Sequence, residues 1–291
     1  MSKQPDGVPV ELRDRQEDIG PWLWLGLPVG LTAMCWLTPL LGQRRWKALM
    51  MGESGFLEVA TVVVLVAAMI VCGLLLARRR GLPRGTVWVV LLLGLASLFY
   101  AGEEASWGQH WLGYGTPRAV KDINKQEEFN LHNLNGRYHT LFNRLPRRLA
   151  EYSVAFGGVL LPLLLIRWRR RPQARKSGWH WILPTLALVP ASLMATCAPI
   201  PKKIIEGFLP HLRENSYVQM AFLQSREDFK ELALALVITL YMLSLFARVR
   251  HGRAARPSWS ALVPQPQPAA VSRSASRGRR PEPPGATAPR R

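Results

Sequence analysis

The sequence predicts an all-α membrane protein: a bundle of six transmembrane helices followed by a disordered, basic C-terminal tail. The first observation is that six segments are long and apolar enough for a spanning helix, which needs about 20 residues. The second is that a net charge of +19 coexists with a mean hydropathy near zero (+0.03), so charged and apolar residues are segregated along the chain. The six predicted spans are 21–42, 56–77, 85–102, 149–168, 178–198 and 231–247.

Charge and proline content distinguish these spans. Segment 56–77 carries only Glu58 near one end, and segment 85–102 carries no charge. Prolines fall in the first and fifth spans, and a spanning helix tolerates them where neighbouring helices satisfy the freed backbone groups. We therefore expect a packed bundle spanning 21–248. These prolines are Pro28, Pro39, Pro184 and Pro190.

Basic residues between the spans predict the orientation. Segments 78–84, 167–176 and 249–291 carry four, six and eight net positive charges. Because Lys and Arg are enriched in cytoplasmic loops, these segments are expected in the cytoplasm. The protein is then a multi-pass protein of a cell membrane with both termini cytoplasmic. Residues 1–20 form the cytoplasmic N-terminal segment and lack the apolar core of a cleaved signal peptide, so the first span is expected to remain as an anchor.

This distribution of charge argues against specific nucleic-acid binding, because the basic residues mark membrane sidedness and contain no stacking module or zinc-finger spacing. The tail 249–291 is rich in Pro, Arg, Ser and Ala and is expected to be disordered. Either it contacts anionic lipid headgroups or it is a solvated tail without a specific partner. Three cysteines, all inside spans, form no CxxC metal site and no disulfide framework: Cys35, Cys72 and Cys197.

The two predicted outer segments, 103–148 and 199–230, hold most of the residues able to bind a polar ligand. All six asparagines and four of the six histidines of the chain lie there. The sequence therefore predicts that any chemical function resides at the outer face of the membrane.

The first outer segment opens with the acidic pair Glu103 and Glu104, at the outer edge of the third span. If the helix continues to Gly113, Glu103, Trp107 and His110 share one face and Ser106 lies beside it. A carboxyl group at this boundary can act as a general acid or base. The predicted catalytic residues are Glu103, Glu104 and Ser106. The alternative is an interfacial tryptophan belt whose acids reach into water.

Segment 123–143 alternates amide, acidic and apolar side chains and contains a strong turn signal at Asn135-Gly136. We expect a short amphipathic element whose amides bind hydroxyls, amides or a headgroup. The predicted substrate-binding residues are Trp107, Gln109, Asn124, Gln126, Glu128, Asn130 and Asn133. His110 and His132 are predicted ligands of a divalent metal such as zinc, which would need three or four converging ligands. Three further acids open the sixth span, where the positive helix end favours them: Glu227, Asp228 and Glu231.

These residues carry a resemblance. The run Glu103-Glu104-Ala105-Ser106-Trp107-Gly108-Gln109, then Thr116-Pro117, then Asn124-x-Gln126-x-Glu128-x-Asn130-Leu131-His132-Asn133 resembles a family of uncharacterised bacterial multi-pass membrane proteins, over about 30 of 291 residues. The resemblance implies a place in an inner membrane and no established activity. The chain is also distantly similar to membrane hydrolases of the alkaline ceramidase type, which use Ser, Asp and several His around zinc, but it lacks their HxxxH pattern in a late span.

Three functions follow as alternatives. The first is a membrane-embedded hydrolase or transferase that acts at the outer face on a lipid or lipid-linked substrate. The second is a structural or assembly protein that binds a partner through its outer segments. The third is a small-solute transporter, for which six spans permit an inverted repeat of three and three. The order given is the order in which the sequence favours them.

Overall fold

The computed structural model describes residues 19–50, 55–78, 82–169, 179–208, Tyr217, Ala221 and 226–254. It divides into two units, 1–253 and 254–291, and only Ala254 of the second unit is among the described residues. The predicted N-terminal segment, up to residue 18, and the predicted disordered tail, from residue 255, lie outside them. So do residues 79–81 and 170–176 of the two predicted cytoplasmic loops, and residues 177 and 178.

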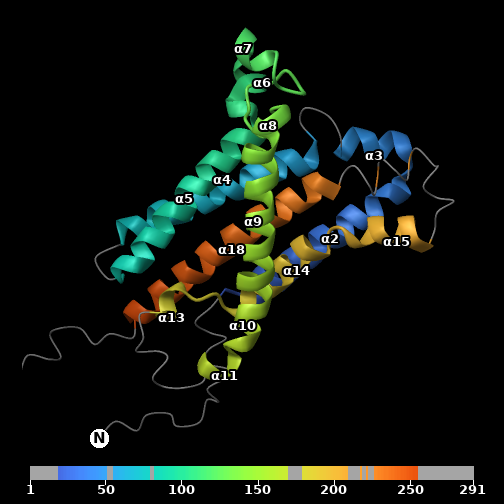
Figure 1. The fold of residues 1–291 in the computed structure, drawn as a ribbon. Coiled ribbons are helices and arrows are strands. Elements are labelled where there is room, and N and C mark those ends of the chain that lie inside the picture. Colours follow the sequence, from blue (N-terminus) through green and yellow to red (C-terminus); the bar gives the residue numbers. More distant parts are fainter. Residues whose placement is uncertain are drawn as a thin grey trace, which may run out of the picture. The chain divides into compact units, whose positions relative to one another are not determined.

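Helices build the described part of the chain, and no named strand occurs in it. In chain order (Figure 1) they are η1 (Trp22–Gly26), α2 (Leu27–Leu37), η2 (Thr38–Leu41), α3 (Gln43–Met50), α4 (Phe56–Ala77), α5 (Arg84–Glu104), η4 (Ser106–Gly108), α6 (Gln109–Leu112), α7 (Arg118–Lys121), α8 (Gly136–His139), η5 (Thr140–Arg144), α9 (Leu145–Ser153), η6 (Val154–Leu160), α10 (Leu161–Leu164), α11 (Ile166–Arg169), α13 (Trp179–Ile182), η7 (Leu186–Leu188), α14 (Val189–Cys197), α15 (Ile200–Phe208) and α18 (Arg226–Ala254).

Four helical stretches among the described residues are long and apolar enough to cross a membrane: Trp22–Leu41, Phe56–Ala77, Arg84–Glu104 and Glu227–Arg250. They correspond to the first, second, third and sixth predicted spans. In the last stretch 72% of the apolar window is buried, against 17–33% in the other three, so α18 forms the centre of the bundle and the others leave apolar faces exposed. Exposed apolar faces of this length are typical of helices in contact with lipid.

The fourth predicted span, 149–168, is occupied by the consecutive helices α9, η6, α10 and α11. The turns at 154–160 are of the wider π type, and Pro162 is the second residue of α10. Val154 and Leu161 keep right-handed helical φ and ψ angles, so α9, η6 and α10 follow one another without a break (Figure 1). Neither this stretch nor the fifth is among the four long apolar stretches named above, so a count of six spans stays a prediction.

The fifth predicted span, 178–198, is broken between α13 and η7, at Leu183, Pro184 and Thr185. Pro184 cannot donate a backbone hydrogen bond, which ends α13. Side chains of α18 form hydrogen bonds with polar groups at this break. Tyr241 donates to the carbonyl of Ile182 (2.6 Å), and Arg248 donates to the carbonyl of Leu183 (3.4 Å). The hydroxyls of Thr185 and Ser244 share a hydrogen bond (3.2 Å). The break is therefore part of the packing against α18.

Glycines allow two helix pairs to approach closely. A Cβ on Gly94 of α5 would lie 2.3 Å from Sγ of Cys72 on α4, and one on Gly158 of η6 would lie 2.0 Å from Oγ of Ser192 on α14. Small residues at such crossings are a common device of membrane helices. Leu65, Ala101 and Ala235 then join α4, α5 and α18 in one apolar cluster.

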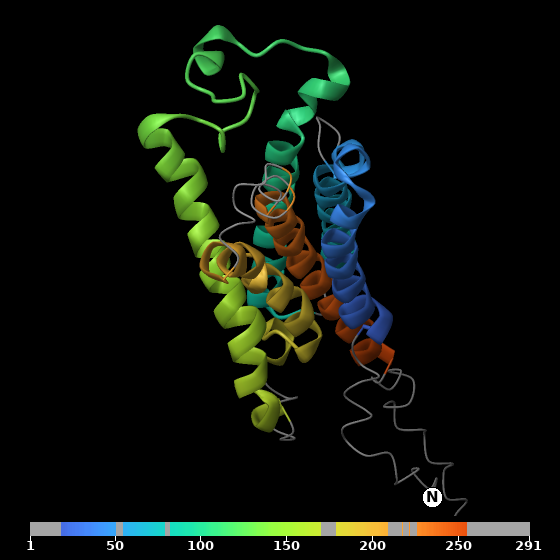
Figure 2. The ribbon, with the colours of Figure 1, turned by 90° about the vertical axis from the view of Figure 1, so that its right-hand side faces the viewer.

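The end of α5, the start of α9 and the start of α18 lie at the same end of the bundle, because Arg147 of α9 binds Glu227 and Glu231 of α18. We call this the motif end. At the opposite end, Arg78 after α4 lies 5.0 Å from the ring centroid of Phe246 near the end of α18. Figure 2 shows the chain leaving α5 at the motif end and returning through the segment 105–135 into α9.

Candidate functional site

The end of α5 is a sharp left-handed turn. The helix ends at Glu104, and Ser106, Trp107 and Gly108 adopt positive φ angles of 42°, 55° and 85°. The expectation that one helix continues to Gly113 and aligns Glu103, Trp107 and His110 by helical spacing is therefore wrong. The turn instead folds the Trp107 ring back onto Gly102, where an added Cβ would lie 2.9 Å from the ring carbons.

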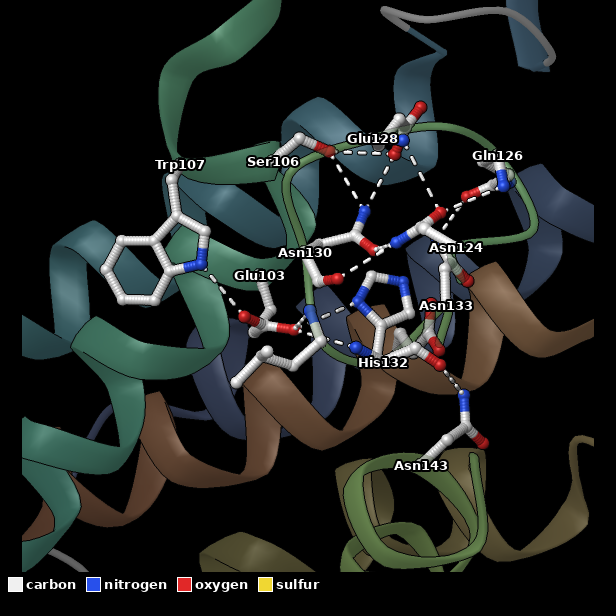
Figure 3. A network of polar contacts seen from close by, with 12 residues as sticks. Glu103, Ser106, Trp107, Asn124, Gln126, Glu128, Asn130, His132, Asn133 and Asn143 are labelled. Carbon is white, nitrogen blue, oxygen red and sulfur yellow. Dashed lines mark hydrogen bonds and ion pairs between the residues drawn. The ribbon is translucent and has the colours of Figure 1, made fainter. Parts of the chain in front are cut away.

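Glu103 is buried, with 4% of its surface exposed, and its carboxylate is saturated by hydrogen bonds (Figure 3). One oxygen accepts from the Trp107 indole (2.8 Å), and the other accepts from the backbone N–H groups of Leu131 (2.7 Å) and His132 (2.9 Å). These contacts join the last turn of α5 to a loop almost thirty residues away. Glu103 therefore acts as the anchor of that loop.

A second set of contacts surrounds Ser106, which is 2% exposed. Its hydroxyl donates to a Glu128 carboxylate oxygen (2.8 Å), and the Asn130 amide donates both to that oxygen (2.7 Å) and to the Ser106 hydroxyl (3.1 Å). The Asn124 amide donates to the backbone and side-chain oxygens of Asn130, each at 2.9 Å. A nucleophile has to reach its substrate, and here the hydroxyl is enclosed.

The remaining predicted substrate-binding residues also bind one another. The Gln109 amide donates to the Thr116 hydroxyl (2.8 Å) and accepts from the backbone N–H of Phe129 (2.8 Å), and the Asn133 amide donates to Gln126. We call Glu103 together with residues 105–135 the cap. All seven predicted substrate-binding residues lie in it, and each forms at least one hydrogen bond within the cap: Trp107, Gln109, Asn124, Gln126, Glu128, Asn130 and Asn133.

The cap has almost no regular secondary structure from residue 122 to 135, so these side chains hold its backbone. A pair of backbone hydrogen bonds, Lys125 to Asn133 (2.9 Å) and Asn135 to Ile123 (2.7 Å), closes the loop. The predicted turn at Asn135-Gly136 is where the loop ends and α8 begins, with Gly136 at a φ of 61°. Asn143 of η5 then donates to the carbonyl of His132 (3.0 Å) and ties the cap to the helix that follows.

Of the two predicted metal ligands, His132 and His110, the structure describes the side chain of His132. His132 is partly buried, and its Nδ1 lies 3.4 Å from a Glu103 oxygen, longer than an ordinary hydrogen bond. The side chain of His110 lies outside the described residues. Within the described part of the chain, no group of three or more His, Cys, Asp or Glu side chains is arranged to hold a metal ion. The nearby His139 has a lowered pKa, because of burial and then the positive charges of Lys125 and Arg144.

A second set of polar residues belongs to α5, α9 and α18. Arg147 of α9 donates to a Glu227 oxygen (2.6 Å) and also binds Glu231, so both arms of its guanidinium are occupied. A second ion pair joins Lys230 of α18 to Glu151 of α9, which lies one turn after Arg147. These pairs hold the starts of α9 and α18 together.

Glu104 faces this set, and the charges of Glu231, Asp228, Glu58 and Arg147 act on it. It is partly buried, yet no hydrogen bond or ion pair reaches it from the described residues. Tyr100, one turn earlier on α5, faces the same charges, and its hydroxyl is buried without a hydrogen-bond partner in the described structure. We call the following residues the inter-helix cluster: Tyr100, Glu104, Arg147, Glu227, Asp228 and Glu231.

Of this cluster, only Glu104 is among the site residues that the sequence predicts. The positive end of the sixth span explains Glu227, Asp228 and Glu231 in the sequence. No predicted site includes Arg147 or Tyr100. One available signal was the spacing of Tyr100 and Glu104, four residues apart and so on one face of a helix. The pairing of Arg147 with residues 80 and 84 positions later has no local signal in the sequence.

Comparisons with known proteins add no relative: no family model, no curated protein and no solved structure matches this chain.

Proposed function

We propose that this chain is an integral membrane protein that binds the polar head of a lipid or lipid-linked substrate at the inter-helix cluster and acts on it with Glu104 as general acid or base. The observation that carries this proposal is the contrast between two adjacent carboxylates. Glu103 has four contacts, and Glu104 has no partner among the described residues. Because Glu104 is only partly buried and is unpaired within the described chain, its carboxylate is open to a ligand, whereas the carboxylate of the buried Glu103 is already bound.

The position of the cluster supports a lipid as the substrate. Tyr100 and Glu104 occupy the last turn of α5, an apolar helix long enough to cross a membrane. A lipid can keep its acyl chains in the hydrocarbon while its head reaches this boundary. There a carboxyl group can exchange a proton with a reacting oxygen or nitrogen, as hydrolases and transferases require.

The cap supports a second function, that of a docking element for a partner protein. It presents exposed apolar side chains, among them Trp111 (65% exposed) and Leu112 (77%). Large exposed apolar groups on a folded polar segment are typical of interaction sites. This alternative needs no unpartnered carboxylate, so the two functions predict different effects of a substitution at Glu104.

Lipid retention tests the proposed function. Wild-type protein and the Glu104→Gln variant would be reconstituted in nanodiscs of mixed phospholipids, released, and examined by native mass spectrometry for bound lipid. We expect wild type to keep at least one lipid and Glu104→Gln to lose it at least about tenfold more readily. Glu206→Gln, at a carboxylate of α15 with 41% of its side chain exposed, is the matched control and keeps lipid like wild type. Equal retention by wild type and Glu104→Gln, or no retained lipid at all, would overturn the proposal.

A further inference from the structure

The charge balance of the inter-helix cluster indicates which part of a lipid head it can receive. Carboxyl groups outnumber the single guanidinium, and both arms of that guanidinium are bound by Glu227 and Glu231. Lys230 is occupied by Glu151. Among the described residues of this region, no cation remains free to bind a phosphate inside the cluster. A cationic group fits its charge better than an anionic one.

The two unpartnered groups indicate hydrogen-bond donors on the ligand. Glu104 offers carboxylate oxygens, and the buried Tyr100 hydroxyl one turn away offers an oxygen and a rotatable O–H. An ammonium group carries three donors and no acceptor, so it matches two neighbouring oxygens. An aromatic ring beside it adds a cation–π attraction. The described carboxylates are not arranged to hold a metal ion, which leaves an organic cation as the matching ligand.

The surface of α9 continues this pattern outward. Successive residues of a helix are rotated by about 100° around its axis, and Arg147 faces the cluster. Seen around this axis, Arg144 and Arg148 lie about 60° and 100° from Arg147. Leu145 and Leu149 come next in the same direction of rotation. Arg144 and Arg148 are exposed, and no ion pair to either is found among the described residues. Leu145 is 49% and Leu149 57% exposed. Around one helix, an acid-rich cluster is therefore followed by two free guanidinium groups and then by an apolar stripe.

This order matches the parts of one class of lipid. Guanidinium groups bind phosphate through paired N–H donors, and an apolar stripe suits an acyl chain. We infer that the inter-helix cluster receives the primary amine of an aminophospholipid, that Arg144 and Arg148 hold its phosphate, and that Leu145 and Leu149 contact its chain. This inference rests on the proposed function and specifies its substrate class.

Headgroup competition tests the inference. Wild-type protein in detergent would be offered equal amounts of phosphatidylethanolamine, phosphatidylcholine and phosphatidylglycerol with identical palmitoyl and oleoyl chains, and bound lipid counted by native mass spectrometry. We expect phosphatidylethanolamine to exceed each of the others at least about tenfold, because phosphatidylcholine has no N–H donor and phosphatidylglycerol no amine. Glu104→Gln should abolish this preference.

The arginines are tested with a double variant. Arg144→Gln combined with Arg148→Gln should lower retention of all three lipids about tenfold and leave the preference for the amine intact. Arg44→Gln combined with Arg45→Gln removes two exposed arginines from α3 and should bind like wild type.

The outcomes separate the two proposals. Lipid that is retained by wild type and lost in Glu104→Gln, but without preference for the amine, overturns this inference and leaves the proposed function standing. A preference for phosphatidylglycerol over phosphatidylethanolamine also overturns this inference and leaves the proposed function standing. Retention that is insensitive to Glu104 overturns both. Retention by the Arg144 and Arg148 double variant equal to wild type overturns the assignment of the phosphate.

Discussion

Two neighbouring acids belong to different regions: Glu103 is bound within the cap, and Glu104 faces the inter-helix cluster. In the cap, the carboxylate of Glu103, the hydroxyl of Ser106 and the amide of Asn130 all bind partners in the same segment. In the inter-helix cluster, a carboxylate and a hydroxyl lack one among the described residues. The comparison teaches that a dense polar motif can serve to fold a loop, while an adjacent carboxylate of the same motif has no partner among the described residues.

The two regions are also stabilised differently. The cap depends on short, neutral or charge-assisted hydrogen bonds within a loop, each contributing about 1 kcal/mol net. The cluster depends on ion pairs between helices, where the loss of one partner leaves a charge uncompensated. Substitutions in the cluster and in the cap should therefore differ in size and in what they disturb.

The largest effect is expected at Arg147. Replacement by Met keeps much of the side-chain volume but leaves Glu227 and Glu231 without their guanidinium. We expect unfolding in detergent to become easier by about 3 kcal/mol, at the lower limit for a buried pair because Arg147 keeps 26% of its side chain exposed. The midpoint of unfolding in SDS measures it. Arg148→Met, at the exposed neighbouring position, is the control and should change little; equal effects would contradict the ion-pair account.

The next effect concerns Gly102. An alanine there would place its Cβ about 2.9 Å from the Trp107 ring and push the ring away from Glu103. We expect a loss of about 2 kcal/mol, of the size typical of overpacking, together with faster proteolysis of the cap. Gly73→Ala, in the middle of α4 with no atom near the added Cβ, should be neutral or stabilising, as expected for glycine replaced in a helix. A cap that remains resistant to protease in Gly102→Ala would refute the contact.

A smaller effect is expected at Trp107. Phenylalanine keeps an aromatic ring over Gly102 and removes only the N–H that donates to Glu103. Because two backbone donors still satisfy the other carboxylate oxygen, we expect a loss of about 1 kcal/mol. This loss is measured by thermal unfolding that is monitored through the far-UV circular dichroism of the helices. A loss as large as that of Gly102→Ala would show that the hydrogen bond, rather than the ring packing, holds the cap.

The smallest effect is expected at Lys121, on the surface of the cap. Its hydrogen bond to Glu127, at 2.7 Å, raises the pKa of Lys121. A lysine with a raised pKa stabilises the fold below its unfolded pKa of about 10.4 and loses this contribution only as the pH rises through the folded value. The contribution of Lys121 to stability should therefore be flat between about pH 6 and 9, and Lys121→Gln should not measurably change the melting temperature. A clear pH dependence removed by Lys121→Gln would disagree with this.

Much of the helical frame could be predicted because apolar length is a local property. The predicted span 56–77 has the same bounds as α4, and 85–102 lies inside α5. The span 231–247 is shorter than α18, because the helix continues through charged residues that hydropathy excludes. The break at Pro184 had a signal in the sequence, yet its position against Tyr241 and Ser244 did not.

The candidate site was less predictable, for two physical reasons. Ser106 and Trp107 adopt positive φ, which neither residue type favours, so only Gly108 hinted at the turn that ends α5. The partners of Arg147 lie 80 and 84 residues away, and their pairing depends on how α9 and α18 pack. The sequence places Glu103 and Glu104 side by side and cannot separate them, and only the contacts of each carboxylate oxygen show that, among the described residues, one is bound and the other is not.

The different roles of Glu103 and Glu104 are tested most directly by one paired measurement. It compares Glu103→Gln with Glu104→Gln for stability in detergent and for lipid retention. An amide at 103 presents an N–H₂ group to donors, so we expect a destabilised, protease-sensitive cap. An amide at 104 removes no contact among the described residues, so we expect wild-type stability and at least about tenfold weaker lipid retention. If Glu104→Gln instead destabilises the protein like Glu103→Gln, or retains lipid like wild type, the assignment of Glu104 as the functional carboxylate is wrong.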